Sequence, residues 1–280
     1  MERIDHLLPW GHLGCERQLS VFRFGSGERK AYIQASLHAD ELPGMRTAWA
    51  LKKRLAELEA QGLLNGVIEL VPVANPIGLA QLFLANHQGR FELSTGKNFN
   101  RDFVELEPLI APALAGQLGS DAAANVALVR EQMRLALAAL PPAASELQGL
   151  QRLLLQHACD ADVVLDLHCD YEAVPHLYTT PEAWPQVEPL ARHLGAQASL
   201  LATDSGGLSF DECFTLLWWQ LQQRFGHCYA IPQGSFSVTL ELRGLADVNH
   251  SHAGHDCQAL IDYLIDFGAI DGESVPLPPL

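Results

Sequence analysis

The sequence predicts an α/β fold in which helices cover both faces of a central sheet. Short runs with strand character alternate with longer runs of helical apolar spacing along the 280 residues. Residues 161–167 form a nearly continuous apolar run, as expected for a strand that is buried on both faces. The length suits one large domain, and the 48% apolar content can supply a sizeable core.

Strand and helix patterns in the first third of the chain are separated by glycine and proline signals. The expected elements are strands over 21–24, 31–36 and 67–73 and a helix over 43–61. Gly25-Ser26-Gly27 between the first two strands predicts a hairpin. Pro43 fits the first turn of the helix and Gly62 terminates it. The second strand therefore leads into the helix through His38-Ala39-Asp40-Glu41.

The rest of the chain continues the same alternation. The expected elements are helices over 122–140 and 146–157, a strand over 161–167, a helix carrying 216–221, a strand over 237–242 and a final helix to 267. Ser209-x-x-Glu212 has the form of a capping box, and Ser251 could cap the final helix. We expect one domain over residues 1–270, followed by a Pro-rich tail over 271–280.

Charge and apolar patterning exclude several classes of partner. Lys and Arg number 18 and Asp and Glu number 33, which gives a formal charge of −15 and disfavours nucleic-acid binding. The longest charge-free run, residues 70–89, is interrupted by Pro72 and Pro76 and cannot be a membrane helix. The acidic N-terminus is wrong for a secretory signal, and the six cysteines form no C-x-x-C pair. We therefore expect a cytoplasmic protein with reduced thiols.

His38 and Glu41, at the predicted strand-to-helix junction, are the first candidate metal ligands. An imidazole and a carboxylate three residues apart can bind one ion, although this spacing alone is common. His168, at the polar end of the buried strand, is the natural third ligand because α/β sheets bind ligands at that edge. Two ligands close together in the sequence, a third ligand far along the chain and a fourth position left for water are typical of a catalytic zinc site.

A zinc-bound water needs a proton acceptor, and Glu241 is the candidate. It is the single acid in the predicted strand Ser237-Val238-Thr239-Leu240-Glu241. Asp166 lies two residues before His168 and on the same side of its strand, where it could orient His168 or contact substrate. Both interpretations stay open.

Amide and guanidinium side chains in the middle of the chain are candidate substrate ligands. Asn100 and Arg101 could hold a substrate carboxylate, and Arg90 could polarise the scissile carbonyl. Surface salt bridges would also explain both arginines. Arg243 could reach substrate, whereas His250, His252 and His255 lack a distant partner ligand and are expected to be surface residues.

Taken in order, these residues resemble a known family. His38-x-x-Glu41, Asn100-Arg101, His168 and Glu241 follow the order of the zinc carboxypeptidases. Asp40-Glu41-Leu42-Pro43-Gly44 and Asn98-Phe99-Asn100-Arg101-Asp102-Phe103 look like the succinylglutamate desuccinylase/aspartoacylase branch. The resemblance spans roughly residues 30–245. In this chain Ala39 replaces the usual glycine. Many relatives carry a small C-terminal β domain, and the Pro-rich tail of this chain could be either a true end or the start of such a domain.

The resemblance implies a zinc carboxypeptidase-like fold with a mixed, twisted, eight-stranded sheet and one zinc ion per chain. His38, Glu41 and His168 would bind the zinc, Glu241 would be the acid/base, and Asn100 with Arg101 would hold a substrate carboxylate. The implied reaction is hydrolysis of the amide bond of a small N-acyl amino acid. A metallocarboxypeptidase that acts on peptide C-termini and a non-catalytic metal-binding domain are the alternatives. A homo-oligomer is compatible with the sequence.

Overall fold

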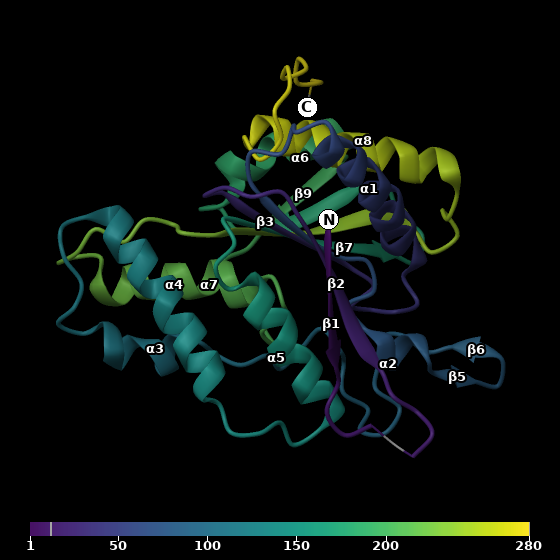
Figure 1. The fold of residues 1–280 in the computed structure, drawn as a ribbon, viewed down its shortest axis with the longest axis horizontal. Coiled ribbons are helices and arrows are strands. Elements are labelled where there is room, and N and C mark those ends of the chain that lie inside the picture. Colours follow the sequence, from purple (N-terminus) through teal and green to yellow (C-terminus); the bar gives the residue numbers. More distant parts are fainter. Residues whose placement is uncertain (12, 280) are drawn as a thin grey trace.

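Eight strands form one mixed sheet, and helices pack on both of its faces (Figure 1). The computed structural model describes residues 1–11 and 13–279. The sheet contains β1 (Glu2–Leu7), β2 (Gln18–Phe24), β3 (Lys30–Ala35), β4 (Val67–Val71), β7 (Val163–Asp170), β8 (His176–Thr179), β9 (Ala198–Leu201) and β10 (Phe236–Gly244). A separate hairpin contains β5 (Leu82–Phe83) and β6 (Asn86–His87). The helices are α1 (Leu42–Ala60), α2 (Pro76–Leu79), α3 (Glu107–Leu114), α4 (Ala122–Ala139), α5 (Glu146–Ala158), α6 (Trp184–Leu194), α7 (Glu212–Phe225) and α8 (His250–Asp266).

The strand order is β1-β2-β4-β3-β7-β10-β8-β9. The four central strands β4, β3, β7 and β10 are parallel, whereas β1, β2 and β8 each join by antiparallel pairing. The predicted hairpin is therefore wrong, because β2 pairs with β1 and β4 and does not contact β3 as a sheet neighbour. The glycine turn instead carries the chain past β4, since Gly25 and Gly27 lie against the backbone of Gly66 and Asn65.

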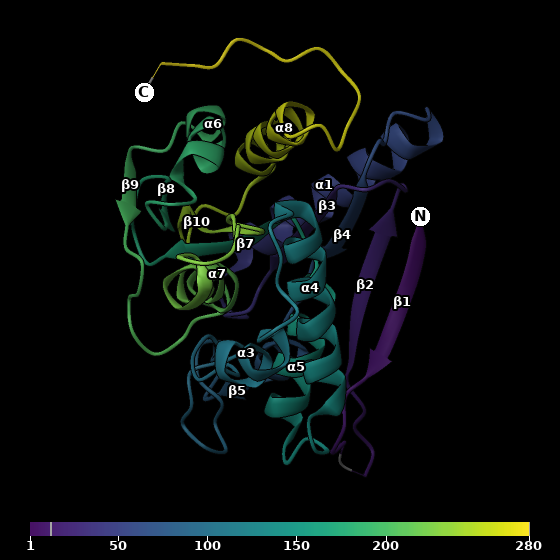
Figure 2. The same cartoon turned by 90° about the vertical axis from the view of Figure 1, so that its left-hand side faces the viewer.

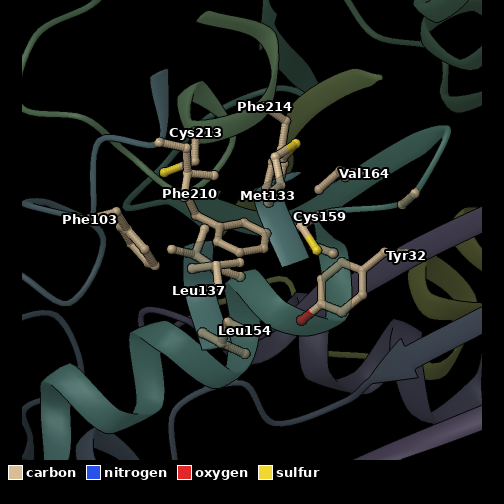
Figure 3. Packing of buried hydrophobic residues seen from close by; sticks show 14 of the residues in the cluster. Tyr32, Phe103, Met133, Leu137, Leu154, Cys159, Val164, Phe210, Cys213 and Phe214 are labelled. Carbon is tan, nitrogen blue, oxygen red and sulfur yellow. The ribbon is translucent and has the colours of Figure 1, made fainter. Parts of the chain in front are cut away.

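Alternate residues of the central strands point into two separate apolar cores. Figure 2 shows the helix layers on either side of the sheet, with α6 and α8 on one side and α3, α5 and α7 on the other. One core lies under α1, α6 and α8 and takes Val163, Leu165 and Leu167 from β7. The other lies under α3, α4, α5 and α7 and takes Val164 from the same strand. Figure 3 shows this second core, where Phe210 packs against Tyr32, Phe103 and Phe214. Asp166 and His168 point to this second face.

The helix starts show which side chains act as caps. The Ser145 side chain accepts the Gln148 N–H at the start of α5. The cap of α8 is Asn249, which accepts the His252 N–H, and the prediction of Ser251 is wrong by two residues. Before α7, Glu212 accepts the Ser209 N–H, but the Ser209 hydroxyl donates to Asp211, so only half of the capping box forms.

Residues 271–279 follow α8 without helix or strand, and Arg192 of α6 donates to the carbonyl oxygens of Pro278 and Leu277. The last residue of the predicted tail, Leu280, lies outside the described residues. Within residues 1–11 and 13–279, none of the helices has the length and apolar character needed to cross a membrane. Cys159, Cys169, Cys213 and Cys257 are buried free thiols, and Cys15 and Cys228 are exposed.

Candidate functional site

His38, Glu41 and His168 meet at the carboxyl edge of the central strands. His38 follows β3, Glu41 is the N-cap residue of α1, and His168 is in β7. All three are buried, and one donor atom from each lies within 4.8 Å of the others. His38 Nδ1 is 2.9 Å from Glu41 Oε1, and His168 Nδ1 is 2.8 Å from Glu41 Oε2. The structure thus brings together the three predicted ligands, which come from separate elements.

Two glycines allow the backbone around Glu41 to approach its neighbours. A Cβ atom on Gly44, in the first turn of α1, would lie 2.7 Å from the carbonyl oxygen of Leu167. A Cβ atom on Gly89 would lie 2.0 Å from the Asp40 nitrogen. The helix can therefore start against β7, where Glu41 also accepts the Cys169 N–H at 3.1 Å.

The outer nitrogen of each imidazole has its own partner. His38 Nε2 is 2.9 Å from Asn98 Oδ1, and His168 Nε2 is 3.0 Å from Asp166 Oδ2, an ion-pair contact without hydrogen-bond alignment. The amide oxygen at His38 and the negative charge at His168 both favour the tautomer with its proton on Nε2, which leaves Nδ1 free for a metal. Of the two roles open to Asp166, the structure favours orientation of His168, because Asp166 is fully buried and is not part of the cavity wall. Asn98 had no signal in the sequence beyond its place two residues before Asn100.

Electrostatics in the cluster favour a carboxylate between the imidazoles. Burial alone would raise the pKa of Glu41, but His168 and His38 outweigh it and hold that pKa well below the usual range. Burial would lower the pKa of His168, but Asp166 and Glu41 raise it well above its usual value. Burial dominates at His38 and lowers its pKa. A divalent cation between these side chains would take the place of the bridging protons.

The donor set fits a zinc ion. Two imidazoles and one carboxylate are a catalytic zinc set, in which bonds of about 2.0–2.2 Å place the donors roughly 3.3–3.5 Å apart. One donor atom from each residue lies within 4.8 Å of the others, which is close enough for the three side chains to share one ion. Among residues 1–11 and 13–279 this is the one group of three or more His, Cys, Asp or Glu side chains with such geometry.

Glu241 lies beside the cluster on β10. It occupies the position opposite His168 in the parallel pairing of β10 and β7. Its Oε2 atom is buried and has no hydrogen-bond partner among the described residues. Burial raises the pKa of Glu241, and nearby His168 offsets part of that rise. A carboxylate in this position can accept a proton from a water near the three ligands.

Arg90, Asn100 and Arg101 line the same cavity, whose volume is about 990 Å³. Arg90 Nη2 donates to Glu41 Oε1 at 2.8 Å, so it contacts a candidate ligand directly. Asn100 Oδ1 accepts the Phe210 N–H at 2.8 Å, and Arg101 Nη1 donates to the Asn100 carbonyl at 2.6 Å. Buried Phe99 and Phe103 anchor this segment in the core on either side. The substrate roles of all three residues stay predictions.

The remaining candidates lie elsewhere. Arg243 is buried and forms an ion pair with Asp256 of α8, so it does not face the cavity. His250, His252 and His255 are in the first two turns of α8, where His250 contacts Arg46 and His255 contacts the Leu194 carbonyl. Tyr178 and Leu200 line the cavity without having been predicted, because nothing in the sequence shows which face of a four-residue strand meets the site.

Solved structures of one family match the chain over its whole length. A succinylglutamate desuccinylase/aspartoacylase family protein from Shewanella amazonensis SB2B is 27% identical with a TM-score of 0.84, and the match covers 100% of this chain and 76% of that one. A counterpart from Shewanella frigidimarina NCIMB 400 is 25% identical with a TM-score of 0.85, covering 99% and 74%. The ectoine utilization protein EutE (DoeB) from Ruegeria pomeroyi shares the fold at 16% identity and a TM-score of 0.63, covering 99% and 70%.

No protein-family model matches the sequence, and no curated protein matches it. The resemblance therefore rests on the ordered site residues and on the solved structures. The eight-stranded mixed sheet agrees with the fold that the sequence implied. The chain has the fold of the succinylglutamate desuccinylase/aspartoacylase family, and the resemblance seen in its sequence is confirmed.

Proposed function

We propose that the protein is a zinc-dependent amidohydrolase that cleaves the amide bond of a small N-acyl amino acid. The observation that carries this proposal is the buried cluster of His38, Glu41 and His168 beside Glu241, at the wall of a 990 Å³ cavity. The names of the similar Shewanella proteins support a deacylase-like hydrolase. The volume lies within the range of small-molecule sites.

His38, Glu41 and His168 would hold the ion. When bound, zinc lowers the pKa of a coordinated water to about 7 and polarises a carbonyl group. Asn98 and Asp166 keep the two imidazoles in the tautomer that exposes Nδ1. Arg90, which is held by Glu41, is placed to support negative charge on the amide oxygen as water attacks.

Glu241 moves the proton in this mechanism. Its unpartnered Oε2 accepts the proton of the attacking water, and the same atom then donates it to the leaving amine. Burial raises the pKa of Glu241, which makes its carboxylate a stronger base for the first step. Arg101 orients a substrate carboxylate at the cavity wall.

Metal content and turnover together test the proposal. Elemental analysis of zinc-reconstituted protein should give about one zinc per chain, and His168→Ala should lose it. Glu241→Gln should retain the zinc while kcat on N-acyl amino acids falls about 10²- to 10⁴-fold. His227→Gln, at an exposed histidine outside the cavity, is the matched control. Absence of zinc from the wild type, or full activity of Glu241→Gln, would overturn the proposal.

A further inference from the structure

One row of cross-strand neighbours leads from the metal cluster to the edge of the sheet. In the strand register, Asp166 of β7 pairs with Thr239 of β10, Thr239 pairs with Tyr178 of β8, and Tyr178 pairs with Leu200 of β9. Paired residues of neighbouring strands point to the same face, so the row lies on the face that carries His168 and Glu241. Strands are about 4.8 Å apart, which places Leu200 roughly 10 Å from Thr239.

The row changes from charged to apolar along its length. Asp166 is completely buried and Thr239 is 8% exposed, whereas Tyr178 and Leu200 are 41% and 45% exposed. Thr239, Tyr178 and Leu200 all line the cavity. Large apolar side chains that stay this exposed inside a concave site are a surface on which an apolar part of a ligand can be buried.

The charged groups of the cavity leave one cation for a ligand. Arg90 is paired with Glu41, whereas no described carboxylate forms an ion pair with Arg101. Glu241 and Asp170 line the same cavity and would repel a second negative charge on the ligand. The cavity therefore matches a ligand with a single carboxylate.

We infer that the substrate is an N-acyl amino acid with an apolar acyl group and one carboxylate, an inference that rests on the proposed function. The carboxylate is bound by Arg101, the amide lies at His168 and Glu241, and the acyl chain extends along Thr239, Tyr178 and Leu200. A dicarboxylic acyl group such as succinyl would instead place its second carboxylate on Tyr178 and Leu200, where the row has no cation.

The size of the preference for an apolar acyl group over a dicarboxylic one follows from the burial of apolar surface. Full burial of one methylene group strengthens binding about fourfold, and a half-exposed wall gives roughly half of that free energy, or about twofold. N-(4-methylpentanoyl)glycine and N-succinylglycine have acyl groups of similar shape, in which a branched alkyl end replaces a carboxylate. Apolar contact and the absence of charge repulsion together should make the alkyl compound bind at least about tenfold more tightly.

The preference can be measured by calorimetric titration of zinc-loaded Glu241→Gln and of the wild-type protein as purified. Leu200→Lys should reduce the tenfold ratio to about two or less, because it removes apolar contact and offers a cation to the succinyl carboxylate, and Tyr178→Ala should reduce it in the same direction. Leu135→Lys, at an exposed leucine of α4 away from the cavity, should leave the ratio unchanged. Because the readout is binding, the preference is measured even if the protein does not hydrolyse the amide, so failure of the proposed function is seen separately.

Three outcomes would overturn the inference. The first is tighter binding of the succinyl compound, or no binding of either ligand. The second is a ratio that survives both Leu200→Lys and Tyr178→Ala. The third is that N-acetylleucine binds as tightly as N-(4-methylpentanoyl)glycine. That result would assign the apolar wall to the amino-acid side chain and not to the acyl group.

Discussion

Asp166 contacts the candidate metal site through His168 and makes no other polar contact among the described residues. Its Oδ2 lies 3.0 Å from His168 Nε2, and both oxygens are buried. Asp166→Asn keeps the shape but removes the charge that holds the imidazole. We expect zinc affinity to fall about 10- to 100-fold, measured by competition with a chelator. Asp271→Asn, at an exposed position, is the control, and an unchanged affinity in Asp166→Asn would contradict this role.

His6 and His157 form a second titratable contact, far from the cavity. Their Nε2 atoms are 2.7 Å apart, and His157 Nδ1 is 2.9 Å from Glu69. Asp5 and Lys30 are the other charged groups near this contact. Burial and the charge of His157 lower the pKa of His6. The folded protein therefore binds fewer protons than the unfolded chain as the pH falls below about 6.5, and its stability decreases in that range.

His6→Gln tests this pH dependence. Between about pH 7.5 and pH 5.5, the Tm of the wild type should fall more than that of His6→Gln, because the variant has no His6 proton to exclude. His227→Gln, at an exposed histidine, should behave as the wild type does. Equal falls in Tm for the wild type and His6→Gln, followed by differential scanning calorimetry, would rule out His6 as the source.

At the scale of elements, α8 fixes the end of β10. The pairing of β10 with β7 becomes irregular between Glu241 and Gly244, and Arg243 has a φ of 67°. Asp256 of α8 is almost completely buried and forms an ion pair with Arg243. Removing one partner leaves the other charge buried without compensation, which is a costly arrangement. The helix thereby holds the bend that follows Glu241.

Asp256→Ala should therefore affect both stability and catalysis. We expect the free energy of unfolding to fall by about 3–5 kcal/mol, measured by urea denaturation. The kcat of the remaining folded protein should also fall, because Glu241 lies two residues before Arg243. Asp262→Ala on the same helix is the control, since Asp262 contacts only the nearby Gln258. A stability loss with unchanged kcat would show that the bend does not position Glu241.

Elements formed by local sequence signals could be predicted, and those formed by distant pairing could not. The helix over 43–61 and the strand over 161–167 agree with α1 and β7 because apolar periodicity reports burial directly. The hairpin prediction failed because the partner of β2 is β4, more than forty residues later in the chain. Asn249 and Ser251 are both good caps, and only packing of α8 decides between them.

The candidate site shows the same division. His38, Glu41 and His168 could be predicted because each stands at a junction between a strand and the next segment, where ligands gather. Asn98 could not be predicted, because its contact with His38 depends on the path of a loop anchored by Phe99 and Phe103. Tyr178 could not either, since β8 and its neighbour β9 are only four residues long each.

At the scale of the whole molecule, the two faces of the sheet have different tasks. The face under α1, α6 and α8 is filled by apolar side chains of alternate strand residues. The opposite face carries Gln34, Asp166 and Thr239 in register across β3, β7 and β10. A single strand such as β7 thus contributes Leu167 to one core and His168 to the site. Rigid packing on the first face fixes the positions of the ligands on the second.

The net charge of −15 opposes the approach of an anionic substrate over long distances, whereas Arg90 and Arg101 attract it inside the cavity. Raising the ionic strength from about 0.01 M to about 0.15 M shortens the screening length from roughly 30 Å to roughly 8 Å. Screening therefore removes the repulsion and leaves the short-range attraction. For a monoanionic N-acyl amino acid, KM should fall about two- to threefold with kcat unchanged.

Steady-state kinetics at a series of salt concentrations tests this balance, with the neutral methylamide of the same compound as the control. The KM of the neutral compound should not respond to salt, because an uncharged compound is neither repelled by the net charge of the protein nor attracted by the arginines of the cavity. A rise of KM with salt for the anion alone would show that attraction by the cavity arginines dominates the whole approach path, so that the acidic surface does not govern substrate capture.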